Sequence, residues 1–186
     1  MIPSDYASRK ELWIRSRLWL SFNEGPFVTL SVQSLGYAER QLLKWEERIA
    51  AIANDRASAE LNRASAELES LIMECAAHSI LWVFGLYEIV RVVKDTNPSK
   101  FEALAELFRK LEILRMPLAK HEVKSAPGYR DIRHYPTGLW FPESGSVGWK
   151  VINPYAEPVR LTRTGLADEF LSITATEPIY IEPPER

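Results

Sequence analysis

Apolar residues recur every seven positions over much of this chain, and this repeat limits the possible folds more than any other feature. One run consists of Leu35, Leu42 and Ile49, and a second consists of Leu61, Leu68, Cys75, Trp82 and Ile89. Side chains seven apart lie on one side of a helix, so the repeat predicts two long helices. We expect a helical hairpin from Ser34 to Lys94; a bend and a break near residue 55 both fit the pattern.

A third helix is predicted after the hairpin. Asp95-Thr96-Asn97-Pro98 ends the second helix, and Ser99 with Glu102 has the spacing of a capping box that opens the next one. The apolar face of this third helix consists of Phe101, Leu104, Leu107, Phe108, Leu111 and Leu114. Residues 34–124 are therefore expected to form the core of a helical bundle.

The segments that flank the bundle are predicted to be rich in β-structure. Residues 11–33 alternate imperfectly around a Gly-Pro pair, which favours two strands joined by a turn. An amphipathic helix over residues 8–21 is the alternative. At the other end, residues 139–161 contain a second expected hairpin, with a short helix from Thr164 to Leu171 after it.

Taken together, these patterns predict an α+β, mainly α fold: a helical bundle around a long hairpin, with small β-hairpins near both termini. The 186 residues suit a single domain. The tail over residues 177–186 has three prolines in ten residues and is expected to be flexible.

Composition excludes several classes of protein. A hydrophobic content of 46% excludes a disordered chain, and a net charge of −2 excludes broad nonspecific binding to nucleic acid. The lone cysteine, Cys75, has apolar neighbours and is predicted to be a buried thiol in a reducing compartment. Charged residues near the N-terminus argue against a secretory signal, so we expect a cytoplasmic protein. The most apolar segment, residues 75–87, is shorter than the roughly 20 residues that cross a bilayer, so no membrane contact is expected.

One polar pair stands out just after the bundle. Continuing the stripe of the third helix by one turn gives Arg115, Leu118 and His121, where apolar residues are expected. An unpaired buried guanidinium is costly, so either this face leaves the core or the charge meets a partner. Pro117 tends to kink a helix or begin a new one, and a bend there would let Arg115 and His121 approach the same cleft.

The segment Leu114-Arg115-Met116-Pro117-Leu118-Ala119-Lys120-His121 resembles the Arg-x5-His signature of the HEPN superfamily, helical domains named for higher eukaryotes and prokaryotes nucleotide binding. In that family the motif follows a long helical hairpin and lies near a dimer interface. Active members cleave RNA without a metal ion. The resemblance covers residues 34–124 and implies a homodimeric ribonuclease or RNA-binding module, with a role as a toxin or antiphage effector and an antitoxin as partner.

The implied chemistry assigns roles to named residues. His121 would move the proton of a ribose 2′-hydroxyl, and Arg115 would stabilise charge on the scissile phosphate. Lys120, Lys124, Arg130 and Arg133 would form a basic rim for RNA. No Gly-rich phosphate loop or zinc constellation occurs, so neither a metal nor another cofactor is expected.

A structural interpretation competes with this chemistry. Arg115 and Lys120 would then be solvated at a helix end, with His121 favoured by the helix dipole. The corresponding function is a noncatalytic scaffold or dimerisation protein that binds a protein partner. His78 is expected to be a hydrogen-bonded core residue, and His134 an exposed loop residue.

Overall fold

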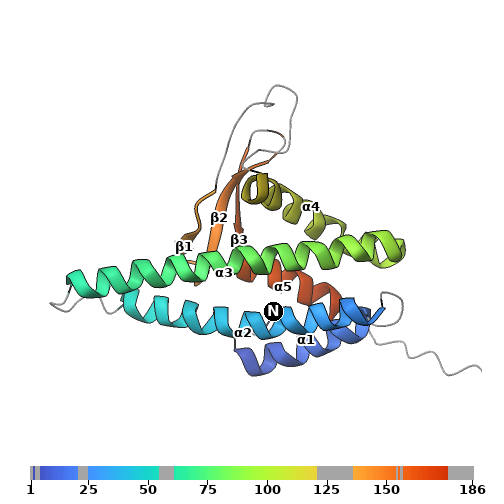
Figure 1. Cartoon of the computed structure of the whole chain (residues 1–186), viewed down its shortest axis with the longest axis horizontal. Coiled ribbons are helices and arrows are strands. Elements are labelled where there is room, and N and C mark those ends of the chain that lie inside the picture. The colour runs from blue at the N-terminus through green and yellow to red at the C-terminus, as the bar shows by residue number, and fades with distance from the viewer. Residues whose placement is uncertain are drawn as a thin grey trace, which may run out of the picture.

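The computed structural model describes residues 2, 5–20, 25–54, 61–120, 136–153, 155 and 157–175. Most of these residues are helical, and a small sheet precedes the last helix (Figure 1). The elements, in chain order, are α1 (Tyr6–Leu20), α2 (Gly25–Asn54), α3 (Leu61–Thr96), α4 (Pro98–Lys120), β1 (Leu139–Phe141), β2 (Ser146–Ile152), β3 (Pro158–Thr162) and α5 (Arg163–Thr174). The predicted α+β, mainly α class is confirmed.

The predicted hairpin is formed by α2 and α3, which run antiparallel along the length of the molecule (Figure 1). Trp82 Nε1 donates to the Leu35 carbonyl oxygen at 3.1 Å, and Arg48 pairs with Glu67 at 2.9 Å farther along. The buried residues of the seam are Leu35, Leu42, Ile49, Leu68, Cys75, Trp82 and Ile89. The hairpin begins earlier than predicted, at Gly25, and residues 55–60 lie outside the described residues.

The β-hairpin predicted over residues 11–33 is wrong, because residues 11–20 belong to α1 and residues 25–33 to α2. The buried side chains of α1 are those of Arg9, Trp13, Ser16, Trp19 and Leu20. Most of these positions are three or four residues apart, as on one face of a helix. Ile14, which belongs to the alternating pattern, is instead 38% exposed. The alternative interpretation, a helix over residues 8–21, is the one that holds.

A single residue, Asn97, separates α3 from α4. Its Oδ1 accepts the backbone N–H of Lys100 at 3.2 Å, and Pro98 occupies the first helical position, where a missing N–H is no loss. The predicted capping box is therefore wrong: Asn97 is the cap, and the Ser99 hydroxyl donates to it at 2.8 Å. The predicted apolar face of α4 is confirmed at Leu104, Leu107, Phe108, Leu111 and Leu114, all buried.

The predicted C-terminal hairpin is confirmed by β1 and β2, and β3 adds a third antiparallel strand in the order β1-β2-β3. The turn between β1 and β2 contains Gly145, whose φ of 58° is a left-handed conformation that glycine adopts without strain. The Trp149 side chain of β2 is fully buried. The sheet thus covers part of the helical core.

The closing helix, α5, is longer than the predicted Thr164–Leu171. The Thr162 hydroxyl oxygen caps it by accepting the backbone N–H of Gly165 at 3.1 Å. Its Phe170 ring packs 5.5 Å from that of Trp13, which ties α5 to α1. The predicted flexible tail, residues 177–186, lies outside the described residues.

Part of α3, Ala66–Thr96, is long and apolar enough to cross a membrane by length and composition. Half of its most apolar stretch is buried inside this fold, and the core helix of a soluble protein has the same character. One such helix is weak evidence for a membrane span. The cytoplasmic location stays a prediction.

Candidate functional site

Arg115 lies on α4, directly after Leu114 of the buried apolar face of this helix. The residue is partly buried, and its guanidinium carbon is 4.6 Å from the centroid of the Tyr87 ring on α3. Within the described part of the chain, no carboxylate or other hydrogen-bond acceptor pairs with it. A cation–π contact engages a ring face and leaves the N–H donors of the guanidinium available. Arg115 is thus a cation held in place by an aromatic ring.

The Tyr87 ring is itself fixed by a row of aromatic side chains between α3 and α4. Tyr87 stacks on Phe108 with 5.4 Å between centroids, and Phe101 meets Phe108 edge-on at the same distance. Lys94 Nζ lies 4.7 Å from the Phe108 centroid. Arg115 therefore contacts the row at Tyr87, whereas Lys94 contacts it at Phe108 and Phe101.

The helix that carries Arg115 continues through Pro117 and ends at Lys120. Pro117 is buried, and it neither ends α4 nor begins a new helix. Lys120 is exposed. The other expected site residues, His121, Lys124, Arg130 and Arg133, lie outside the described residues. The approach of Arg115 and His121 to one cleft therefore stays a prediction.

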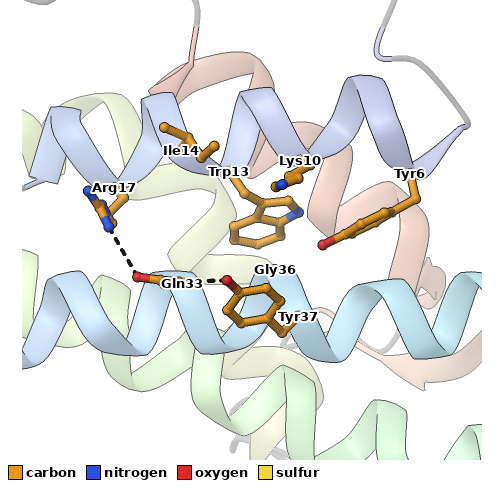
Figure 2. Close-up of a pocket in the computed structure, with 8 residues that line it drawn as sticks. All are labelled: Tyr6, Lys10, Trp13, Ile14, Arg17, Gln33, Gly36 and Tyr37. Atoms are coloured by element: carbon orange, nitrogen blue, oxygen red, sulfur yellow. Dashed lines mark hydrogen bonds between the residues drawn. The ribbon is translucent and has the colours of Figure 1, made fainter.

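A pocket of about 190 Å³ opens between α1 and α2, away from the predicted site (Figure 2). Its lining residues are Tyr6, Lys10, Trp13, Ile14, Arg17, Gln33, Gly36 and Tyr37. We call it the α1–α2 pocket. It combines three aromatic rings with two cationic side chains, and no acidic residue lines it within the described part of the chain.

The Trp13 ring lies at the centre of this pocket and is held rigidly (Figure 2). Its Nε1 donates to Glu39 at 2.5 Å. On the α2 side, a Cβ at Gly36 would lie 2.8 Å from Trp13 Cγ, so only glycine lets the α2 backbone approach the ring this closely. The sequence position of Gly36, inside a long helix, is explained by this contact.

An apolar groove lies on another surface, between α2 and α3. Its walls include Phe27, Leu30 and Val92, and Gly85 of α3 contributes to its floor. Phe27 is 82% exposed and Leu30 is 59% exposed. We call this surface the α2–α3 groove. Exposed apolar side chains around a groove are typical of a protein-binding surface.

Four charged residues form a buried cluster where α1, α2 and α5 meet. Arg9 donates to Glu39 at 2.6 and 3.1 Å, Arg163 donates to the same Glu39 at 3.1 Å, and Arg163 also pairs with Glu46. We call Arg9, Glu39, Glu46 and Arg163 the charge cluster. Each of the four is at most 3% exposed.

The charges of the cluster pair with one another, and Arg9 also pairs with a third carboxylate, that of Asp168, at 2.6 Å. Glu46 also accepts the Ser146 hydroxyl of β2 at 2.7 Å. Burial alone would lower the pKa of Arg163, but the Glu46 and Glu39 charges outweigh it and raise that pKa. Burial would lower the pKa of Arg9 too, but its bonds to Glu39 and Asp168 outweigh this effect and raise that pKa. Both arginines therefore stay charged at every physiological pH. We interpret this mutual pairing of buried charges as a structural clasp that joins α1, α2 and α5.

Comparison with known proteins identifies neither a family nor a function for this chain. No protein-family model matches the chain, and no curated protein or solved structure is detectably similar to it. The resemblance to the HEPN superfamily therefore rests on the sequence motif alone.

The charge cluster was missed at the level of sequence, although a signal exists. Glu39 and Glu46 each follow a seam residue, Leu35 or Leu42, by four positions, so they lie on the apolar side of α2. Carboxylates at such positions require cationic partners. Their identity, Arg9 and Arg163, is not visible in the spacing.

The sequence also predicts whether His78, Cys75 and His134 are buried or exposed. The prediction that His78 is a core residue is wrong: its side chain is exposed, and its ring packs against Trp45 with 4.7 Å between centroids. Its Nδ1 is 2.9 Å from the Glu74 carbonyl oxygen, so this nitrogen carries the donated proton. The prediction that Cys75 is a buried thiol is confirmed, whereas His134 lies outside the described residues.

Proposed function

We propose that this chain binds RNA at the C-terminal end of α4 and cleaves it without a metal ion. The observation that supports the proposal is the state of Arg115: a partly buried cation, held on the Tyr87 ring, with no acceptor among the described residues. A guanidinium with available donors suits the bidentate recognition of a phosphate group. Lys120, Lys124, Arg130 and Arg133 would extend the basic surface along the RNA backbone.

The proposed reaction is an attack by the ribose 2′-oxygen on the adjacent phosphorus. His121 would take the 2′-hydroxyl proton, the bond from phosphorus to the 5′-oxygen would break, and a second acidic group would protonate that oxygen. Arg115 would stabilise the charge that grows on the phosphate oxygens. A homodimer would supply the second histidine. Such an activity would suit a toxin or antiphage effector restrained by an antitoxin.

The test is an RNA cleavage assay in EDTA with purified parent protein, Arg115→Ala and His121→Ala. We expect metal-independent cleavage by the parent and a loss of at least about 100-fold in both variants, the usual size of a lost acid–base or charge-stabilising group. Arg109→Ala is the matched control, because Arg109 lies on the same helix, is exposed, and already pairs with Glu106 at 2.7 Å.

Two outcomes would count against this proposal. Equal background cleavage by the parent and all variants would exclude catalysis at Arg115. Loss of activity in Arg109→Ala as large as in Arg115→Ala would show that the loss is not specific to Arg115. Thermal unfolding of each variant separates lost chemistry from lost folding.

The rival function is a noncatalytic scaffold or dimerisation protein. The α2–α3 groove favours it, because Phe27 and Leu30 expose apolar surface that a second copy of the chain would bury. A parent protein that neither cleaves nor binds RNA, but is a dimer in solution, would support this function in place of the first.

A further inference from the structure

The α1–α2 pocket has the chemistry of a site for a small anion with a flat ring. Two of its lining residues, Lys10 and Arg17, are cationic, and a third cation is close: the Arg40 guanidinium carbon lies 5.1 Å from the centroid of the Tyr6 ring. None of the described lining residues is acidic, and the nearby Glu39 carboxylate is already paired with Arg9 and Arg163, so the lining carries a net positive charge. An anionic ligand is therefore favoured over a cationic one.

Arg17 has a buried hydrogen-bond donor in this pocket that is not satisfied. Its Nη1 donates to Gln33 Oε1 at 3.1 Å, but its buried Nε has no hydrogen-bond partner within the described part of the chain. A buried donor without an acceptor costs free energy. A small rotation of the Arg17 side chain toward an oxyanion in the pocket would remove that cost.

A second donor faces the same space. Gln33 Nε2 donates to the Tyr37 hydroxyl oxygen at 3.2 Å, which leaves the Tyr37 O–H proton for another acceptor. Figure 2 shows Arg17, Gln33 and Tyr37 linked along one side of the pocket, with Lys10 and Tyr6 on the other side of the Trp13 ring. The donors thus surround an aromatic centre.

The volume and the aromatic lining of the pocket indicate that the part of the ligand without charge is a single flat ring. A cavity of roughly 150 Å³ holds one benzene ring, and this pocket measures 190 Å³. Its aromatic side chains, Tyr6, Trp13 and Tyr37, favour a flat ring through stacked or edge-on contacts. The Glu39 bond and the Gly36 contact hold Trp13 in place before any ligand arrives.

We propose that the α1–α2 pocket binds a small aromatic oxyanion: one ring that carries a carboxylate or a phosphate group. Arg17 and Tyr37 bind the oxyanion, Lys10 adds positive charge at the entrance, and the Trp13 ring contacts the flat part of the ligand. The site is independent of the proposed RNA site, because it uses neither Arg115 nor any residue of α4.

The test is an NMR titration of the ¹⁵N-labelled full chain with benzoate and, separately, with phenyl phosphate. We expect saturable shifts centred on Gly36 and Tyr37, with a Kd of about 1 mM or tighter, within reach of a ligand this small. Tighter binding of benzoate would identify an aromatic carboxylate as the ligand class. Tighter binding of phenyl phosphate would identify an aromatic phosphate ester.

Benzamidine, which has the same ring with a positive charge, and inorganic phosphate, which has no ring, are the ligand controls. Each is expected to bind at least about tenfold more weakly, because benzamidine lacks the negative charge and inorganic phosphate lacks the ring. Arg17→Ala and Lys10→Ala are expected to weaken binding of benzoate and phenyl phosphate. Lys10 is exposed, so its variant keeps the test valid if Arg17→Ala unfolds.

Arg15→Ala is the matched protein control, since Arg15 is an exposed arginine of the same helix that does not line the pocket. Three results would overturn the proposal: no saturable shift with either oxyanion, equal binding of benzamidine, or equal weakening by Arg15→Ala and Arg17→Ala.

Discussion

A single buried carboxylate, Glu46, sets the electrostatic surroundings of several neighbours. It pairs with Arg163, accepts the Ser146 hydroxyl at 2.7 Å, and lies close enough to Cys75 to affect its ionisation. Burial is the main cause and the Glu46 charge adds to it; together they raise the pKa of the Cys75 thiol to about 12. Cys75 is therefore a packing residue, not a nucleophile.

The raised pKa predicts slow alkylation of Cys75. At pH 8 only about one thiol in ten thousand would be ionised at a pKa near 12. We expect iodoacetamide to label the native chain at least about 100-fold more slowly than the urea-unfolded chain, as measured by mass spectrometry. The matched control is Cys75→Ala combined with Ala77→Cys, which places the thiol at an exposed position of the same helix.

The same shift gives the chain a pH dependence with a definite sign. The unfolded thiol ionises near its ordinary pKa of about 8.5, whereas the folded thiol stays neutral up to about pH 12. The contribution of Cys75 to stability is therefore complete below about pH 8.5 and is lost as the pH rises toward 12. Rapid labelling of the native parent at pH 8 would contradict both expectations.

At the scale of elements, the junction between α3 and α4 depends on one cap. Asn97 ends α3 with its backbone N–H, which donates to the Val93 carbonyl oxygen at 2.7 Å, and begins α4 with its side chain. The chain turns at this one residue, and α4 packs back on α3 through Tyr87 and Phe108, which brings Arg115 beside Tyr87. The position of the proposed RNA site thus follows from the shortness of this connection.

Substituting the cap is expected to destabilise the chain more than substituting the residue predicted from sequence. Asn97→Ala removes the acceptor for the Lys100 N–H and should lower the free energy of unfolding by about 1 kcal/mol. Ser99→Ala, at an exposed position, should change it by less than about 0.5 kcal/mol. Urea unfolding followed by circular dichroism measures both. A larger effect of Ser99→Ala would restore the capping-box interpretation.

At the scale of the whole molecule, the charge cluster joins segments that are far apart in sequence. Arg9 comes from α1, Glu39 and Glu46 from α2, and Arg163 from the start of α5. Through Ser146 the same cluster reaches β2. The sheet and both terminal helices are therefore attached to the long hairpin by polar contacts as well as by apolar packing.

Breaking the cluster is expected to be costly. Arg163→Met leaves the buried Glu46 carboxylate without its cation and should lower the free energy of unfolding by about 3–5 kcal/mol. Arg48→Met, which removes a largely exposed ion pair with Glu67, should cost less than about 1 kcal/mol. Both values come from urea unfolding at pH 7.

A second variant tests the cause of that loss. Combining Arg163→Met with Glu46→Gln removes the unpaired charge, so it should recover part of the lost stability. If the double variant is no more stable than Arg163→Met, or if Arg163→Met costs no more than Arg48→Met, the cluster is not the clasp described above.

The sequence by itself determined the long hairpin, the apolar face of α4 and the C-terminal strands, because each depends on a periodicity that neighbouring residues set. It did not determine α1, whose short run fits both a strand and a helix until Trp13 and Trp19 are packed against the bundle. Nor did it pair Glu39 with Arg9 and Arg163, or bring Arg17 and Tyr37 together around one pocket. Those contacts join residues distant along the chain, so only the tertiary structure decides which charges and rings meet.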